Sequence, residues 1–195
     1  MRFAFRRTAL AAGLALAPTA ALAHVGVGAH DHAGLAAGFL HPVSGLDHVA
    51  AMVAVGLWAA TLGGRAMLAV PAAFVGVLSL GAVLGVAGVA LPAVEPMIAA
   101  SVVVLGLLTA FAVRVPAAAA AALVGFLGLF HGYAHGAEMP EMASPALYGL
   151  GFVTATVLLH AAGLGLGLVL PRLSLVAARG LGAVVAAIGV MLVAG

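Results

Sequence analysis

Six long stretches with almost no charged residue dominate this 195-residue sequence and restrict what it can fold into. They cover residues 42–62, 66–91, 96–113, 116–136, 145–170 and 174–194. A helix that crosses a bilayer needs about 20 apolar residues, and each stretch approaches or exceeds that length. Soluble domains are about 25% charged, whereas this chain is 6% charged and 66% hydrophobic. The sequence therefore predicts an all-α integral membrane protein with a six-helix transmembrane bundle.

Prolines stand near the ends of these stretches, where they interfere least with helices. A proline in the first turn of a helix costs no hydrogen bond, and a proline just past the end cannot extend the helix. Four prolines occupy predicted helix starts, namely Pro42, Pro96, Pro116 and Pro145. Two more follow predicted helix ends, namely Pro92 and Pro171.

Residues 1–23 have the features of a signal peptide. Three arginines precede a short apolar segment at 8–17, and Ala-Leu-Ala at 21–23 fits the small-residue cleavage pattern. Cleavage there makes His24 the new N-terminus and leaves 24–195 as the transmembrane domain; the alternative is an uncleaved first helix. The mature chain then has four arginines against five acidic residues, which gives no reason to expect nucleic-acid binding.

Charges in the predicted loops are segregated by sign. If the mature N-terminus is outside, the cytoplasmic loops contain every arginine that remains after cleavage: Arg65, Arg114, Arg172 and Arg179. The charged residues of the outer loops are all acidic, namely Glu95, Glu138 and Glu141. We interpret Glu95 and Glu141 as ordinary loop charges. This arrangement obeys the positive-inside rule. It predicts a multi-pass protein of the bacterial inner membrane whose mature N- and C-termini are periplasmic.

Histidines and acidic residues cluster at the outer ends of two predicted helices. The first helix begins with His41, Asp47 and His48, and the fourth ends with His131, His135 and Glu138. His131 and His135 share one helix face at a spacing of four residues, and His41 and His48 do so if one helix includes both. His160 lies deeper, about 22 Å into the fifth helix. Ionisable residues inside a membrane bundle are costly and usually functional.

Imidazole and carboxylate ligands suit divalent transition metals such as Ni, Co, Zn or Cu. We therefore predict one outer metal site made by Asp47, His48, His131, His135 and Glu138, with His41 as a further candidate ligand and His160 on the path of the ion. Three alternatives stay open. Asp47 would orient His48 instead of binding the ion; His160 would only hydrogen-bond between helices; and the N-terminal His24, His30 and His32 would form a metal-capturing tail or a solvated segment. The chain has no Cys, so a thiolate site is excluded.

At these residues the chain resembles the HupE/UreJ family of membrane proteins, which accompany hydrogenase and urease and are regarded as nickel, sometimes cobalt, permeases. The first shared motif is His41-Pro42-x-x-Gly45-x-Asp47-His48 with Met52 beyond it, and the second is Phe130-His131-Gly132-x-Ala134-His135-Gly136-x-Glu138. A looser third motif surrounds His160. The resemblance implies uptake of Ni²⁺ or Co²⁺ across the inner membrane and a functional link to hydrogenase or urease maturation proteins, and it implies no enzyme activity.

Two other functions are consistent with the same residues. Histidines on two helices can ligate a haem axially, although the adjacent acidic residues favour a small cation, and a Soret band in the absorption spectrum would identify a haem subunit. A membrane chaperone that binds a metal ion without moving it differs from a carrier only in a flux assay. An intramembrane protease is disfavoured because no Gly-x-Ser-Gly turn is present.

The absence of native Cys makes the predicted topology directly testable. In Arg179→Cys, the new thiol should be inaccessible to a membrane-impermeant maleimide added to intact spheroplasts and should react only after the membrane is permeabilised, because arginine-bearing loops face the cytoplasm. Equal labelling before and after permeabilisation would contradict this orientation.

Overall fold

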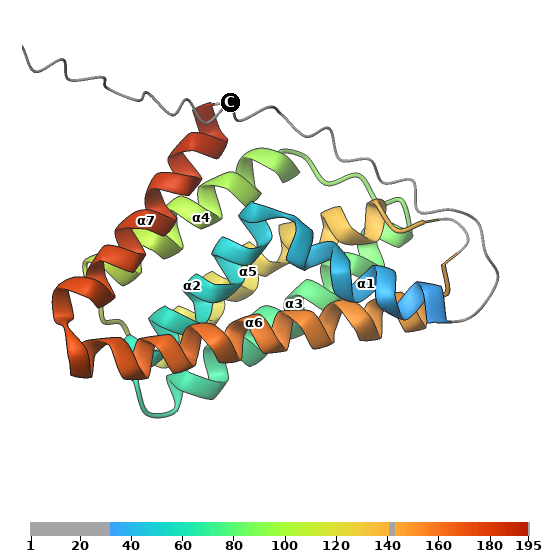
Figure 1. Cartoon of the computed structure of the whole chain (residues 1–195). Coiled ribbons are helices and arrows are strands. Elements are labelled where there is room, and N and C mark those ends of the chain that lie inside the picture. Colours follow the sequence, from blue (N-terminus) through green and yellow to red (C-terminus); the bar gives the residue numbers. More distant parts are fainter. Residues whose placement is uncertain (1–31, 141–142, 195) are drawn as a thin grey trace, which may run out of the picture.

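A computed structural model describes residues 32–140 and 143–194, and all regular structure in these residues is helical (Figure 1). The helices are α1 (His32–Ser44), α2 (Leu46–Leu62), α3 (Ala66–Val86), α4 (Val94–Ala110), α5 (Ala117–Ala137), α6 (Pro145–Leu173) and α7 (Leu175–Ala194). This confirms the all-α fold. The predicted signal peptide, together with His24 and His30, lies outside the described residues.

Four of the helices are long and apolar enough to cross a membrane unaided, namely α3, α5, α6 and α7. The bent pair formed by α1 and α2 makes a fifth candidate span. Helix α4 has 17 residues and is therefore about 26 Å long, against a hydrocarbon core of about 30 Å. A multi-helix membrane bundle is thus supported, whereas the count of six spans stays a prediction.

The prediction of one continuous helix over 42–62 is wrong, because the chain bends by 81° at Gly45. Pro42 lies inside α1 instead of starting a helix, and Gly45 is extended with φ −92° and ψ 121°. A Cβ atom on Gly45 would stand only 2.7 Å from Asp47 Oδ1 and 2.9 Å from His48 Nδ1. Glycine therefore lets the start of α2 fold back against the bend, and His41 and His48 lie on different helices.

The remaining helix ends differ from prediction by a few residues. Helix α3 ends at Val86 instead of 91, because Gly88 adopts a left-handed φ of +68° soon afterwards. Helix α6 continues to Leu173, so Pro171 lies in its last turn and not beyond its end. The backbone N–H of Ser174 donates to the Leu170 carbonyl at 2.7 Å, which completes that final turn.

Glycines bring the helices into direct backbone contact. On α5, a Cβ atom on Gly132 would collide with the carbonyl oxygen of Leu78 on α3, and one on Gly81 of α3 would collide with the Leu129 carbonyl of α5. The same kind of contact joins α4 to α7 and joins both α1 and α2 to α6. Small residues serve this purpose in membranes, where close van der Waals packing has to replace the hydrophobic effect between helices.

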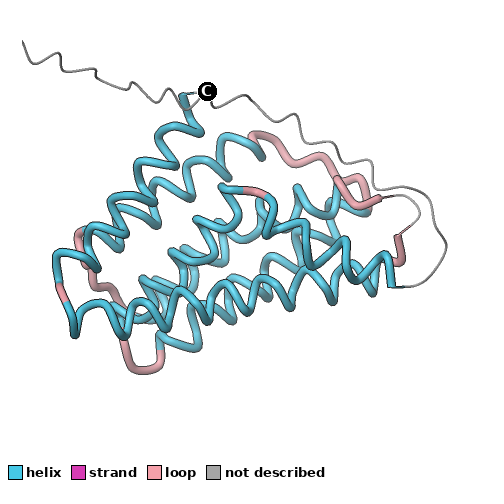
Figure 2. The backbone as a smooth tube through the Cα atoms, in the orientation of Figure 1, coloured by secondary structure: helices cyan, strands magenta, loops and turns pink. Residues whose placement is uncertain are grey.

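The connections between helices gather at two ends of the bundle (Figure 2). The loops after α2, α4 and α6 lie at one end, and those after α3 and α5 lie at the other. The first end carries the arginines at 65, 114, 172 and 179. Glu138 directly follows α5 and Asp47 lies in the first turn of α2, so both acidic residues belong to the opposite end of the bundle from the arginines.

Glycine contacts on α3 supply a matched pair of substitutions. Gly81→Ala should lower stability by about 1–3 kcal/mol, because the added methyl group forces α3 and α5 apart. Gly76 lies on the same helix with nothing within 4 Å of an added Cβ atom, so Gly76→Ala should be neutral or stabilising, by up to about 1 kcal/mol of helix propensity. Thermal unfolding in detergent, followed by circular dichroism, measures both; equal effects would disprove the packing argument.

Candidate metal site

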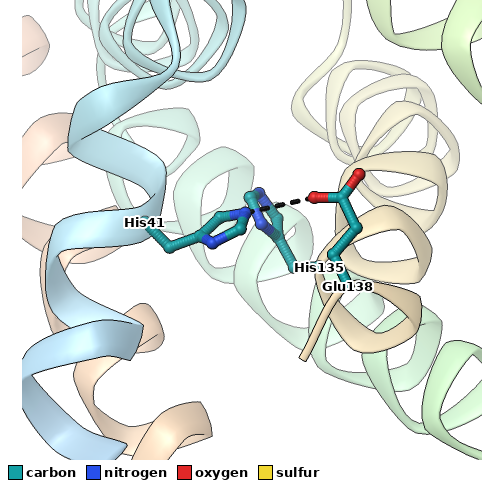
Figure 3. Close-up of side chains that lie close together, drawn as sticks. All are labelled: His41, His135 and Glu138. Atoms are coloured by element: carbon teal, nitrogen blue, oxygen red, sulfur yellow. Dashed lines mark hydrogen bonds and ion pairs between the residues drawn. The ribbon is translucent and has the colours of Figure 1, made fainter. Parts of the chain in front are cut away.

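Three side chains form the outer part of the candidate site. His41 comes from α1, His135 from the last turn of α5, and Glu138 directly follows α5. Each offers one ligand atom within 4.8 Å of the others, and the His41 and Glu138 side chains point toward one another (Figure 3). His41 Nε2 donates to Glu138 Oε2 at 3.2 Å. This hydrogen bond lowers the pKa of the Glu138 carboxyl group, with burial opposing it, so Glu138 is held as a carboxylate.

His48 connects this outer group to the interior. Its ring centroid lies 4.2 Å from that of His135 and 5.1 Å from that of His131. The predicted approach of the two histidine motifs is therefore present in the structure, although His41 reaches the cluster from a separate helix.

Asp47 holds His48 in place. Its Oδ1 atom is 2.7 Å from His48 Nδ1 and accepts the His48 backbone N–H at 2.8 Å. A carboxylate can only accept, so the imidazole proton is on Nδ1 and the Nε2 lone pair is free. This geometry favours the alternative in which Asp47 orients the histidine instead of binding an ion itself.

Ser101 of α4 is a polar neighbour of the cluster that the motifs do not include. Its Oγ atom lies 2.7 Å from His131 Nε2, and both side chains are completely buried. The signal that could have identified Ser101 is its position as a polar residue in the apolar stretch 96–113. Thr109 shares that signal, but its hydroxyl group only donates to Leu105 of its own helix.

Several buried ring nitrogens have no hydrogen-bond partner among residues 32–140 and 143–194. They are His48 Nε2, His131 Nδ1, both ring nitrogens of His135 and both of His160. A buried polar atom without a partner costs free energy comparable to a lost hydrogen bond. An unusual concentration of such atoms calls for an explanation, and a metal ion is a suitable partner for imidazole nitrogen.

His160 lies deeper in the bundle than the cluster, and one aromatic ring lies close to both. The ring of Phe74 on α3 has its centroid 5.7 Å from that of His131 and 5.1 Å from that of His160. On α2, a Cβ atom on Gly56 would collide with the His160 carbonyl oxygen. Gly56 is eight residues beyond His48 along α2, so the His160 backbone lies about 12 Å deeper. Phe74 is completely buried and was not predicted from the sequence.

A hollow lies beside Asp47, next to the histidine cluster. Asp47 and Glu95 line a hollow of about 370 Å³ between the first turns of α2 and α4 and the end of α7. The prediction that Glu95 is an ordinary loop charge did not anticipate that it shares a hollow with Asp47. The two carboxylates give this hollow a negative potential that attracts cations.

Comparisons with known proteins agree with this arrangement. The family model described as "HupE / UreJ protein" matches residues 12–192. The chain is also 50% identical over 196 residues to Protein HupE of Rhizobium leguminosarum bv. viciae, and the alignment covers the whole of both proteins. No solved structure matches the chain. The family match over nearly all of the sequence, together with a full-length relative at this identity, shows that the chain belongs to the HupE/UreJ family.

Proposed function

We propose that this protein takes up a divalent transition-metal ion, Ni²⁺ or Co²⁺, across the bacterial inner membrane. Membership of the HupE/UreJ family associates it with hydrogenase- and urease-linked nickel or cobalt transport, in a family of transporters and accessory proteins and not of enzymes. The ion enters from the periplasmic end, where the histidine cluster lies, and supplies the maturation of hydrogenase or urease.

The observation that carries this proposal is the group of unpaired imidazole nitrogens inside an apolar bundle. His48, His131 and His135 each keep at least one buried ring nitrogen without a partner in the described part of the chain. Nitrogen ligands accompanied by carboxylate oxygen suit Ni²⁺ and Co²⁺. A transported ion also has to leave, and a site without thiolate binds such ions less permanently.

We assign capture of the ion to the outer part of the site, formed by His41, His135 and Glu138. The Glu138 side chain is 56% exposed and the His41 side chain 31%, so both reach solvent, whereas His135 is buried beside them. Glu138 attracts the cation, and His41 and His135 replace part of its water shell. The neighbouring His48 ring, in contact with His135, then receives the ion without a large displacement.

Passage inward is assigned to His131, Phe74 and His160. The Phe74 ring lies close to both histidines, with its centroid 5.7 Å from that of His131 and 5.1 Å from that of His160. We infer that an ion that leaves His131 for His160 has to pass this ring. In this position Phe74 keeps water and protons from following the ion through the bundle.

The geometry disfavours the haem alternative. Axial imidazoles have to stand on opposite faces of a porphyrin, whereas the rings of His48 and His135 are in contact at 4.2 Å. The alternative of a metal-binding chaperone is separated from a carrier by measuring nickel flux into proteoliposomes.

The outer site is tested by amide substitutions that keep size and polarity. His135→Gln should abolish high-affinity uptake of radioactive nickel into proteoliposomes, because this residue touches both His41 and His48. Asp47→Asn should weaken binding by about 10–100-fold, the usual cost of losing a group that orients a ligand. Glu138→Gln should cost less than His135→Gln, because the exposed carboxylate mainly attracts the ion.

Thr154→Val is a suitable control for these variants, since its exposed hydroxyl group bonds only to Leu150 of its own helix. It should transport normally. Unchanged nickel uptake by a folded His135→Gln protein would overturn the proposed site.

The inner path is tested by separating binding from flux. His160→Ala should slow uptake at least tenfold while leaving most equilibrium nickel binding in place, because the residue lies below the cluster. Phe74→Ala should instead increase proton leak through proteoliposomes, measured with an internal pH dye, while Phe126→Ala on the exposed surface of α5 should not. Normal transport by His160→Ala would reduce this residue to a packing role.

A further inference from the structure

We propose that Ser101 is a positioning residue that fixes the tautomer of His131, so that the Nδ1 lone pair of His131 is offered to the transported ion. This inference rests on the proposed function of the histidine cluster. It adds a residue on α4 to a site otherwise built from α1, α2 and α5.

The tautomer follows from counting protons along a short hydrogen-bonded chain. Ser101 Oγ lies 2.6 Å from the carbonyl oxygen of Ile98 and 2.7 Å from His131 Nε2. A carbonyl oxygen can only accept, and a serine hydroxyl group has one proton to donate. That proton goes to Ile98, since two lone pairs would otherwise face each other at 2.6 Å. His131 Nε2 must then carry a proton and donate it to Ser101.

Because the ring proton of His131 is on Nε2, its lone pair is on Nδ1. This atom is buried and has no hydrogen-bond partner among the described residues. The His131 ring also contacts that of His48. A free lone pair on a fixed ring next to another histidine is the arrangement that a metal ligand needs.

The burial of both side chains lets Ser101 control the tautomer of His131 effectively. Both Ser101 and His131 are 0% exposed, so water has no access to replace the missing partner if Ser101 is lost. Without Ser101, His131 can rotate or exchange its proton between the two nitrogens. The lone pair would then point at the cluster for only part of the time, and the affinity for the ion would fall.

The experiment compares nickel binding to purified protein in detergent by isothermal titration calorimetry. Ser101→Ala should weaken binding about 10–100-fold, whereas Ser101→Thr, which retains the hydroxyl group, should recover most of the affinity. Thr109→Val is the matched control on the same helix, because Thr109 is also buried but bonds only to its own backbone. It should bind nickel within twofold of the unmodified protein.

A double-mutant cycle separates positioning from packing. In a His131→Gln background, Ser101→Ala should have no further effect on nickel affinity, because the tautomer that it controls is gone. An equal loss in both backgrounds would overturn the proposal, as would normal binding by Ser101→Ala alone.

A metal-free measurement keeps this inference independent of the transport proposal. Ring-nitrogen NMR of histidine-labelled protein should show a protonated Nε2 and an unprotonated Nδ1 for His131, assigned by comparison with His131→Gln. Ser101→Ala should remove this preference. If the unmodified protein shows the tautomer but does not bind nickel, the proposed function fails and the role of Ser101 in setting the tautomer stands. If His131 carries its proton on Nδ1, the inference is wrong.

Discussion

Direct contact between helix backbones at glycine is the interaction on which the rest of the structure depends. Helix α5 illustrates this, because Gly128, Gly132 and Gly136 follow one another at intervals of four residues and all face α3. His131 and His135 each precede one of these glycines by one position. One residue corresponds to a rotation of about 100° around the helix. Fixing the glycine face against α3 therefore turns both histidines toward His48 of α2.

This coupling explains why glycine and histidine are adjacent in the α5 motif. The glycine sets the distance and rotation of the helix, and the histidine takes its direction from that rotation. A bulkier residue at 132 would displace α5 from Leu78 and would move His131 with it. A similar relation holds on α6, where Gly163 packs closely on Val53 of α2 one turn beyond His160. The candidate metal ligands on the helices are thus positioned by the packing of the bundle.

Much of this arrangement could be predicted from the sequence. Long apolar stretches are sufficient to locate helices, and a spacing of four residues places His131 and His135 on one face. The bend at Gly45 could not be predicted, because the residues on both sides of it are compatible with a helix and a glycine between them does not by itself specify a break. The bend lets α1 and α2 both pack against α6, and that contact between distant parts of the sequence forms only in the folded chain.

The roles of Ser101 and Phe74 could not be predicted for a related reason. Both lie in helices without a histidine motif, and their importance comes from neighbours distant in sequence. Ser101 is 30 residues from His131, and the Phe74 ring lies close to histidines of α5 and α6. A polar residue in an apolar helix is a useful signal, yet Thr109 gives the same signal and has only a local hydrogen bond. Distinguishing the two requires knowing which helices are adjacent.

His48 and His131 differ in the group that orients the imidazole ring, and this difference suits the proposed transport. His48 donates Nδ1–H to the negatively charged carboxylate of Asp47. His131 donates Nε2–H to the neutral hydroxyl group of Ser101, which supplies orientation without charge. In the proposed function, we therefore expect His48 to bind the ion more strongly than His131. An ion that passes from His48 to His131 would then leave more easily toward His160, which suits a carrier because it has to release what it binds.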